Sequence, residues 1–268
     1  GKEGHSLGFM RGLTNLGKVV GTILVSAIFL IPRVQADRDG GGRMGYTTTY
    51  IAILVFLGLA AVIALGMARS TEPLERKRVY FHRKFNKYYI LEIFYGGRKQ
   101  VFLTFAPYLL ILRYGTDVEY LAGLLGICAS INILINPLIG RMIDKIGYRN
   151  VMISDTVILF FVCLIYGFAH RIFNEQTALF IISVTFILDR MISNASIASS
   201  VYAGRISGSK EEMTSTLTTG LSVNHLVTIL IALAGGFIWE KMGVEYLFSL
   251  AALMAAANSL FACTVSKE

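Results

Sequence analysis

Charged residues are scarce in this chain, making up 16% of its 268 residues, against about 25% in an average soluble domain. A soluble protein of this length could bury a large core, but it would need more polar side chains than these to cover it. Proline is scarce as well, with four in the whole chain, so long helices can run without interruption. These shortages argue against a soluble globular protein.

Cysteine and histidine are also rare, with three and four copies. Cys128, Cys163 and Cys263 lie inside apolar runs without metal-ligand spacing, and we expect them to be small buried hydrophobic side chains. The chain has no His-Glu-x-x-His, Gly-x-Ser-x-Gly or Gly-x-x-x-x-Gly-Lys-Ser/Thr motif, which speaks against a membrane-embedded hydrolase and against direct drive by ATP. We therefore expect no enzyme activity, no metal and no cofactor.

The apolar residues come in long blocks. Eight runs each approach the ~20 residues that a helix needs to cross a ~30 Å hydrocarbon layer. Backbone groups in lipid must be hydrogen-bonded internally, and the ~10-residue alternating segments of a membrane barrel do not occur. The sequence therefore predicts an all-α integral membrane protein with eight transmembrane helices, at residues 19–32, 46–68, 88–112, 118–139, 151–169, 177–202, 214–238 and 244–265.

The net charge of +8 could suggest nucleic-acid binding, but the positions of the basic residues indicate another cause. When the loops are assigned alternately to two sides, sixteen Lys and Arg fall on one side, six on the other and three within apolar runs. Cytoplasmic loops of membrane proteins carry such an excess. We therefore expect no nucleic-acid partner, and predict a multi-pass protein of the plasma (inner) membrane, surrounded by lipid bilayer, with both chain ends cytoplasmic.

A short polar string, Gly140–Asn150 (GRMIDKIGYRN), separates the fourth and fifth runs. A loop this short makes the flanking helices antiparallel neighbours. The string resembles the cytoplasmic loop signature of the major facilitator superfamily of transporters, which reads G, three residues, D, K/R, one residue, G, then basic residues. The matching positions are Gly140, Asp144, Lys145, Gly147 and Arg149, whereas Tyr148 departs from the pattern, because a basic residue is commoner there.

A basic linker agrees with this register. Residues 69–87 hold seven Lys and Arg, and the signature string follows the second apolar run after them. Transporters of the resembled family consist of two six-helix halves joined by a cytoplasmic linker. The resemblance implies a partial major facilitator fold, with the last two helices of the N-terminal half in 1–68, the linker in 69–87 and the complete six-helix C-terminal half in 88–268. Its first four helices would be missing partners from the same chain, and the string would help hold one conformation of the transport cycle.

Polar groups deep in a membrane are costly, so each is a functional candidate. On the third run, Arg98 lies eleven residues beyond Lys87, or ~16 Å into the layer. Four runs after the linker bring polar groups to about this depth, as expected of a central cavity in a transporter half. The candidates for substrate binding or coupling are Glu92, Arg98, Lys99, Asn132, Asp189, Arg190, Asn224 and His225.

Each candidate has a structural alternative. Asp189 could form an ion pair with a nearby cation that only locks helices together. Asn132 and Asn136 could form helix–helix hydrogen bonds rather than line a cavity, and His225 could carry a proton or act as an interhelical donor. Glu92 is close enough to Lys87 to belong to the membrane interface.

Charge pairs are also expected at the cytoplasmic face. Asp155 lies near the start of the fifth run and is expected to contact the charges of the signature string. Lys145 and Arg149 can pair with acidic residues across the bundle, such as Glu211 or Glu212.

The leading hypothesis is a secondary active transporter that moves a small solute by alternating access, coupled to a proton carried by an acidic residue or histidine of this set. The midplane cations outnumber the nearby Asp189, which would suit an organic anion as substrate. The alternative is a non-transporting receptor or scaffold built on a transporter-like bundle.

Overall fold

The computed structural model describes residues 14, 16–17, 19–25, 27–28, 31–37, 43–66 and 79–266. These residues form helices and short joints, and no strand occurs among them. Residues 17–75 form one compact unit, and the rest of the chain forms another. The domain boundaries predicted at 68 and 87 stay predictions, because residues 67–78 lie outside the described residues.

The unit of residues 17–75 contains the short helix α2 (Pro32–Ala36) and the long helix α3 (Arg43–Leu65). The side chain of Asp37 accepts a hydrogen bond from the backbone N–H of Met44 at 2.7 Å, in the first turn of α3. Large apolar side chains are exposed on all faces of α3. A helix that is apolar all round is suited to a lipid environment.

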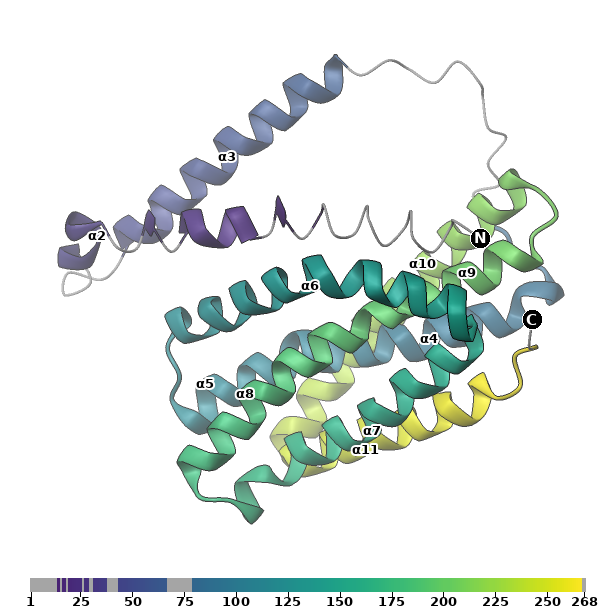
Figure 1. Ribbon diagram of the computed structural model, residues 1–268. Helices are drawn as coiled ribbons and strands as arrows, with labels where there is room; N and C mark the ends of the chain where they lie inside the picture. The colour runs from purple at the N-terminus through teal and green to yellow at the C-terminus, as the bar shows by residue number, and fades with distance from the viewer. Residues whose placement is uncertain are drawn as a thin grey trace. The chain divides into compact units, whose positions relative to one another are not determined.

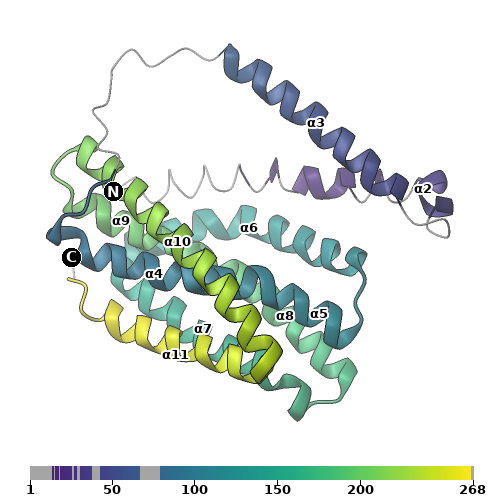
Figure 2. The same ribbon diagram turned by 180° about the vertical axis from the view of Figure 1, so that it is seen from behind.

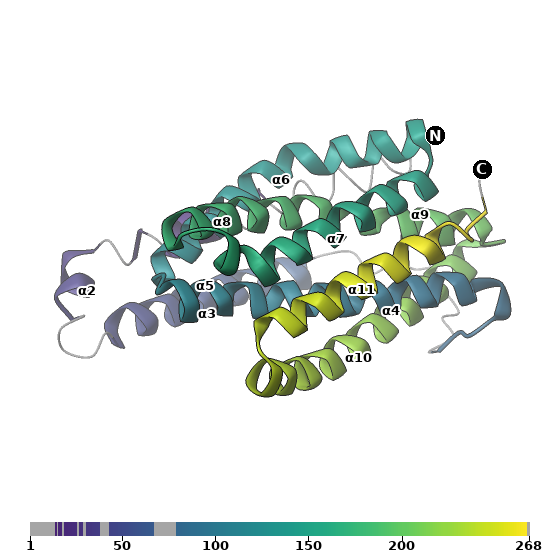
Figure 3. The same cartoon turned by 90° about the horizontal axis from the view of Figure 1, so that it is seen from below.

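The rest of the described chain, from Val79 to Ser266, is a helical bundle (Figure 1). Helix α7 packs along α11, and α4 packs along α10 (Figures 1 and 2). Helix α11 lies between α7 and α4, while α8 contacts both α6 and α7 (Figure 3). In chain order the elements are η2 (Arg83–Phe85), α4 (Asn86–Gln100), η3 (Val101–Phe105), α5 (Ala106–Tyr114), α6 (Val118–Ile146), α7 (Tyr148–Ile172), α8 (Glu175–Ile192), η4 (Ser193–Ser196), α9 (Ile197–Ile206), α10 (Lys210–Met242) and α11 (Val244–Ala262).

Six helices in the described part of the chain are long and apolar enough to cross a membrane. Each overlaps one of the predicted runs, so the prediction of an all-helical, multi-pass membrane protein is confirmed. Two further runs, 19–32 and 88–112, are not among the six, and the count of eight stays a prediction. The six are Arg43–Leu65, Glu119–Ile146, Tyr148–Ile172, Glu175–Ile206, Lys210–Met242 and Val244–Ala262.

The run 88–112 is one helical rod with an irregular middle. Helix α4 continues into η3, a five-residue π-helical segment, and then into α5. Pro107, in the first turn of α5, has no N–H to offer the preceding turn. The wider π turn accommodates this loss, and such segments are frequent at functional sites.

The helices α8 (Glu175–Ile192) and α9 (Ile197–Ile206) form a second rod with an irregular middle. Helices α8 and α9 are joined by η4, a four-residue 3₁₀ turn at Ser193–Ser196. The side chains of Ser193 and Asn194 both donate to the carbonyl of Arg190, at 3.0 and 3.1 Å. These bonds satisfy a backbone group at the end of α8 and thereby stabilise the tighter turn.

The signature string is almost entirely helical, which corrects the expectation of a loop. Helix α6 runs through Asp144 and Lys145 to Ile146, and α7 begins at Tyr148. Gly147 alone joins the two helices, with a φ of 85°. Only glycine adopts such a φ at little cost. The predicted tight antiparallel connection is therefore present, but its charged residues belong to helix ends.

The chain end is held to the same end of the bundle by three side chains. Arg149 Nη2 donates to the carbonyl of Cys263 at 2.6 Å, Tyr148 donates to the carbonyl of Ser266 at 3.1 Å, and Lys87 donates to that of Thr264. The last carbonyls of a helix have no intrahelical donor. The carbonyl of Cys263 directly follows α11, so the cationic donor Arg149 satisfies it and interacts favourably with the helix dipole.

Glu212, at the start of α10, makes a second set of contacts there. It accepts hydrogen bonds from Tyr80 at 3.1 Å and from the backbone N–H of Gly208 at 2.5 Å, and it lies 3.5 Å from Lys84 Nζ. Burial and the hydrogen bond with Glu212 raise the pKa of Tyr80 above its ordinary value. The expected pairing of Glu212 with Arg149 is therefore wrong.

Replacing Arg149 with alanine should lower the stability of the bundle by ~1 kcal/mol, because the Cys263 carbonyl loses a charged donor. The measurement is the thermal unfolding midpoint of the purified protein in detergent. Arg141→Ala is the matched control, because Arg141 is exposed on α6 and makes no hydrogen bond or ion pair among the described residues. An equal loss in both variants would contradict a specific role for Arg149.

The buried apolar side chains form two clusters. One surrounds η3, α5, α8 and α11, and the other surrounds α4, α9 and the start of α7. Helix α4 contributes Tyr95 to the second cluster, and η3 contributes Val101 to the first. Helix α7 likewise contributes Met152 and then Leu159. The boundary between the two clusters therefore crosses these helices at residues 96–100 and 153–158.

Candidate functional site

Arg98 connects three helices at this boundary. From α4, its Nη1 lies 2.5 Å from Asp155 Oδ1 on α7, and its Nη2 lies 3.3 Å from Asp189 Oδ1 on α8. The exposed fractions of the three side chains are 7%, 1% and 5%. We call this set of Arg98, Asp155 and Asp189 the charged triad.

The charged triad brings one positive and two negative groups together away from water. Buried charges are tolerated only when they are paired and hydrogen-bonded. The one guanidinium binds both carboxylates, and the set would carry one net negative charge with all three groups ionised. The ion pairs within such an arrangement change in strength when a proton binds to one of the carboxylates or a charged ligand binds nearby.

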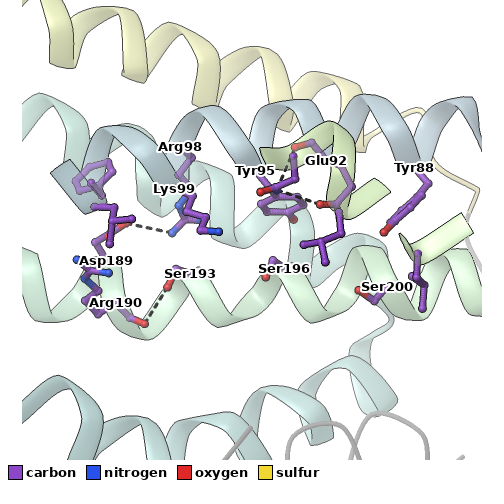
Figure 4. A pocket seen from close by; sticks show the side chains of 15 residues that line it. Tyr88, Glu92, Tyr95, Arg98, Lys99, Asp189, Arg190, Ser193, Ser196 and Ser200 are labelled. Carbon is purple, nitrogen blue, oxygen red and sulfur yellow. Dashed lines mark hydrogen bonds and ion pairs between the residues drawn. The ribbon is translucent and has the colours of Figure 1, made fainter. Parts of the chain in front are cut away.

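A cavity of about 490 Å³ opens beside the charged triad. Its walls come from α4 and η3, from α8, η4 and α9, and from α10 (Figure 4). Its volume lies within the range of small-molecule sites. The lining residues are Tyr88, Glu92, Tyr95, Arg98, Lys99, Phe102, Leu103, Asp189, Arg190, Ser193, Ser196, Ser200, Leu217, Leu221 and Asn224.

The cavity has two chemically different parts. Arg98, Lys99, Asp189 and Arg190 gather at one end, whereas Tyr88 and Ser200 lie at the other (Figure 4). Both irregular turns contribute to the wall, since Phe102 and Leu103 belong to η3, and Ser193 and Ser196 to η4. The helices therefore depart from regular geometry next to the cavity.

Glu92 lies in the middle of the cavity wall and is 9% exposed. Its carboxylate accepts hydrogen bonds from Ser199 Oγ at 2.9 Å and from Asn224 Nδ2 at 3.1 Å. The backbone makes this contact possible, because a Cβ on Gly96 would lie 2.6 Å from the carbonyl oxygen of Asn224. Helices α4 and α10 therefore touch at Gly96, and Glu92 and Asn224 are fixed together beside that contact.

Two cations of the cavity make no ion pair within the described part of the chain. Lys99 is exposed toward the cavity, and no hydrogen bond of its ammonium is found there. Arg190 lies over the ring of Phe186, with its guanidinium carbon 5.1 Å from the ring centroid. The charged end of the cavity therefore has two positive groups in addition to the charged triad.

Most of the predicted site residues come together in this cavity. Glu92, Arg98, Lys99, Asp189, Arg190 and Asn224 all line it. The ion pair considered for Asp189 is also present, with Arg98 as its partner. The two interpretations of Asp189, cavity residue and helix-locking ion pair, therefore apply to the same side chain.

Three other predicted polar residues lie elsewhere. Asn132 on α6 donates to the carbonyl of Arg190 at 3.3 Å and accepts from Asn194 at 3.0 Å, which are helix–helix hydrogen bonds. Asn136 is fully buried, and its amide makes no hydrogen bond to any residue that the structure describes. His225 is exposed on α10, next to Asn224 but outside the cavity wall.

The signature residues lie away from this cavity. Asp144 and Lys145 are exposed on the last turn of α6, and neither makes an ion pair among the described residues. Gly140 is buried within α6, while Gly147 forms the joint to α7. The expected pairing of Lys145 with Glu211 or Glu212 is not found in the described part of the chain.

The expectation for Asp155 is wrong. It binds Arg98 in the bundle interior rather than the charges of the signature string. Helix α7 begins at Tyr148, three residues before the apolar run at Val151, so Asp155 lies two turns inside the helix. Had the sequence prediction started this helix at Tyr148, directly after Gly147, it would have placed Asp155 two turns inside the helix.

The sequence also contained a signal for the hydroxyl groups of the wall. Ser193, Ser196 and Ser200 follow a spacing of three and four residues, which places them on one side of a helical rod. Tyr88, Glu92 and Tyr95 on α4 follow a spacing of four and then three residues, which likewise places them on one side of a helix. These two rows face the cavity together (Figure 4).

The arrangement presents charged groups, hydroxyl groups and apolar side chains to a molecule in the cavity. No group of three or more His, Cys, Asp or Glu residues that could hold a metal ion is found in the described part of the chain. The chain is an all-helical, multi-pass membrane protein whose bundle has a cavity lined by charged, hydroxyl and apolar side chains. No family model matches this chain, and no curated protein is significantly similar to it.

Proposed function

We propose that the protein is a secondary active transporter of the major facilitator type, which binds a small solute in the cavity beside the charged triad. The observation that carries the proposal is a cavity of about 490 Å³ lined by buried Arg98 and Asp189 within an apolar helical bundle. Intramembrane ionisable groups that face a cavity mark substrate and ion pathways. The short joint at Gly147 and its flanking charges support the proposed family, and a plasma-membrane location with cytoplasmic chain ends belongs to the same proposal.

Asp189 is the proposed carrier of a coupling proton. It lines the cavity, whereas Asp155 does not, and its contact with Arg98 is the longer of the two, at 3.3 Å against 2.5 Å. A proton on Asp189 would weaken this contact and leave Arg98 bound to Asp155 alone. Protonation would in this way alter the positive charge that the cavity presents to a solute.

Asp189→Asn should separate the coupling function from solute binding. We expect accumulation driven by a pH gradient to fall at least ~10-fold, because the amide cannot take up the proton, while solute counterflow persists. The measurement uses full-length protein in proteoliposomes and a panel of radiolabelled sugars, sugar acids, amino acids and dicarboxylates. Asp144→Asn, on the exposed end of α6, is the matched control and should retain both activities.

Unchanged accumulation in Asp189→Asn would contradict the coupling role. Binding of a panel solute by the wild-type protein without any counterflow would instead favour the receptor or scaffold function. That alternative is also consistent with a charged triad that locks α4, α7 and α8 together.

A further inference from the structure

We propose that the cavity selects a hydroxylated organic anion, namely a polyol chain or ring that carries one carboxylate or phosphate group. The inference rests on the proposed solute-binding role of the cavity and specifies the class of solute. Three features of the wall support it: two cations at one end, Lys99 and Arg190, which outweigh the single net negative charge of the charged triad, a row of hydroxyl groups with the Glu92 carboxylate along the length, and apolar side chains of α10.

The charged end would bind the anionic group. Lys99 and Arg190 project from opposite walls, one from α4 and the other from α8 (Figure 4). Neither makes an ion pair in the described part of the chain, whereas Arg98 is already bound by two carboxylates. An anion between Lys99 and Arg190 would receive charge-assisted hydrogen bonds from both sides.

The middle and far parts of the cavity would bind hydroxyl groups. Ser193, Ser196 and Ser200 form a row of hydroxyls along η4 and α9. Glu92 offers a carboxylate acceptor, which suits the donating hydroxyls of a polyol. Tyr95 is 5% exposed, and its hydroxyl makes no hydrogen bond within the described part of the chain.

The third wall is apolar. Leu217 and Leu221 on α10 line the cavity one turn apart, and the ring of Tyr88 packs against α10 beside them, where a Cβ on Gly220 would lie 2.4 Å from it. A hydroxylated carbon chain or sugar ring has C–H groups as well as hydroxyls, and these can pack against leucine and aromatic side chains. The cavity would thus bury both kinds of surface of the same molecule.

The negative charge of Glu92 determines which way round the solute would bind in the cavity. Lys99 lies seven residues beyond Glu92 on the same helix, which separates them by ~10 Å along the helix axis. A carboxylate or phosphate near Glu92 would be repelled, whereas the same group between Lys99 and Arg190 would be attracted. The anionic group therefore lies at the charged end and the hydroxyl groups extend toward Ser200.

A matched set of ligands tests this class directly. Binding to the purified full-length protein is measured by isothermal titration calorimetry with gluconate, with sorbitol, which lacks the charge, and with hexanoate, which lacks the hydroxyls. We expect gluconate to bind at least ~10-fold more tightly than either one, equivalent to one good polar contact. Glycolate tests the length of the site, and the phosphate monoester of sorbitol distinguishes phosphate from carboxylate.

Three substitutions in the cavity assign its ends, and two substitutions outside it are their controls. Lys99→Gln and Arg190→Gln should each weaken gluconate binding ~10-fold and leave sorbitol binding unchanged, and Lys241→Gln, an exposed cation paired with Glu240, is the control. Ser196→Ala should weaken gluconate binding ~3-fold, while Ser130→Ala, exposed on α6, should not. Thermal unfolding of each variant in detergent verifies folding independently of binding.

The outcomes separate this proposal from the transport proposal. Equal binding of gluconate, sorbitol and hexanoate would overturn the proposed class, as would no gluconate binding by a folded protein. Counterflow of a neutral sugar or an amino acid alone would support a transporter but contradict the hydroxylated anion. Gluconate binding without counterflow would support the class and contradict transport.

Discussion

Arg98→Ala is expected to lower the stability of the bundle by ~3–5 kcal/mol, because it leaves Asp155 and Asp189 buried without a cation. Both carboxylates are at most 5% exposed, so solvent can replace little of the lost interaction with the guanidinium. The measurement is the thermal unfolding midpoint in detergent, together with the yield of monodisperse protein. We expect a large loss in both.

A triple variant distinguishes charge imbalance from lost packing. Arg98→Ala combined with Asp155→Asn and Asp189→Asn removes all three charges, and should recover most of the lost stability. Arg113→Ala, an exposed arginine at the end of α5, is the control for removing a cation from the same rod. If the triple variant were as unstable as Arg98→Ala, the charged triad would not be the reason for the loss.

Gly96→Ala is expected to have the second large effect. Its new Cβ would lie 2.6 Å from the carbonyl oxygen and 3.1 Å from the Cα of Asn224, both of which are backbone atoms of α10. Helices α4 and α10 must separate to admit it, at a cost of ~1–3 kcal/mol. Asn224 would also move away from Glu92, so we expect solute binding to fall together with the unfolding midpoint.

The neighbouring glycine is a close control. A Cβ on Gly97 would lie 2.5 Å from Met254 Cε, the flexible end of a side chain. Methionine can change its rotamer at little cost, so Gly97→Ala should unfold within a few degrees of the wild-type protein. Similar losses for Gly96→Ala and Gly97→Ala would show that this part of α4 is sensitive to any added methyl group, and would contradict a specific contact with α10.

The site residues that could be predicted are those whose position depends only on distance along the chain. Arg98 and Asp189 lie far inside apolar runs, and counting residues from the run ends places both at depth. Asp155 was missed because helix α7 starts before its apolar run does, a consequence of the one-residue joint at Gly147. Hydropathy locates the apolar part of a helix, whereas the first residue of α7 is set by the turn at Gly147.

The side of a helix was harder to predict than its depth. Asn224 and His225 are adjacent in sequence at the same depth, yet only Asn224 faces the cavity. Similarly, the spacing of Ser193, Ser196 and Ser200 places them on one side of a rod but does not assign that side to a cavity, because small polar residues in apolar runs also serve helix packing. The 3₁₀ turn sets their direction, and such a turn has no clear signal in hydropathy.

The charged triad has a consequence for the order in which the protein is made. Arg98 is synthesised 57 residues before Asp155 and 91 residues before Asp189. A lone arginine at the centre of a membrane helix costs ~2.5–3.5 kcal/mol on insertion scales, so the segment around Arg98 is a poor membrane helix until its partners exist. Stable integration of α4 should therefore wait until the ribosome has completed α7 and α8. Nascent chains truncated before Asp155 should leave this segment accessible to water.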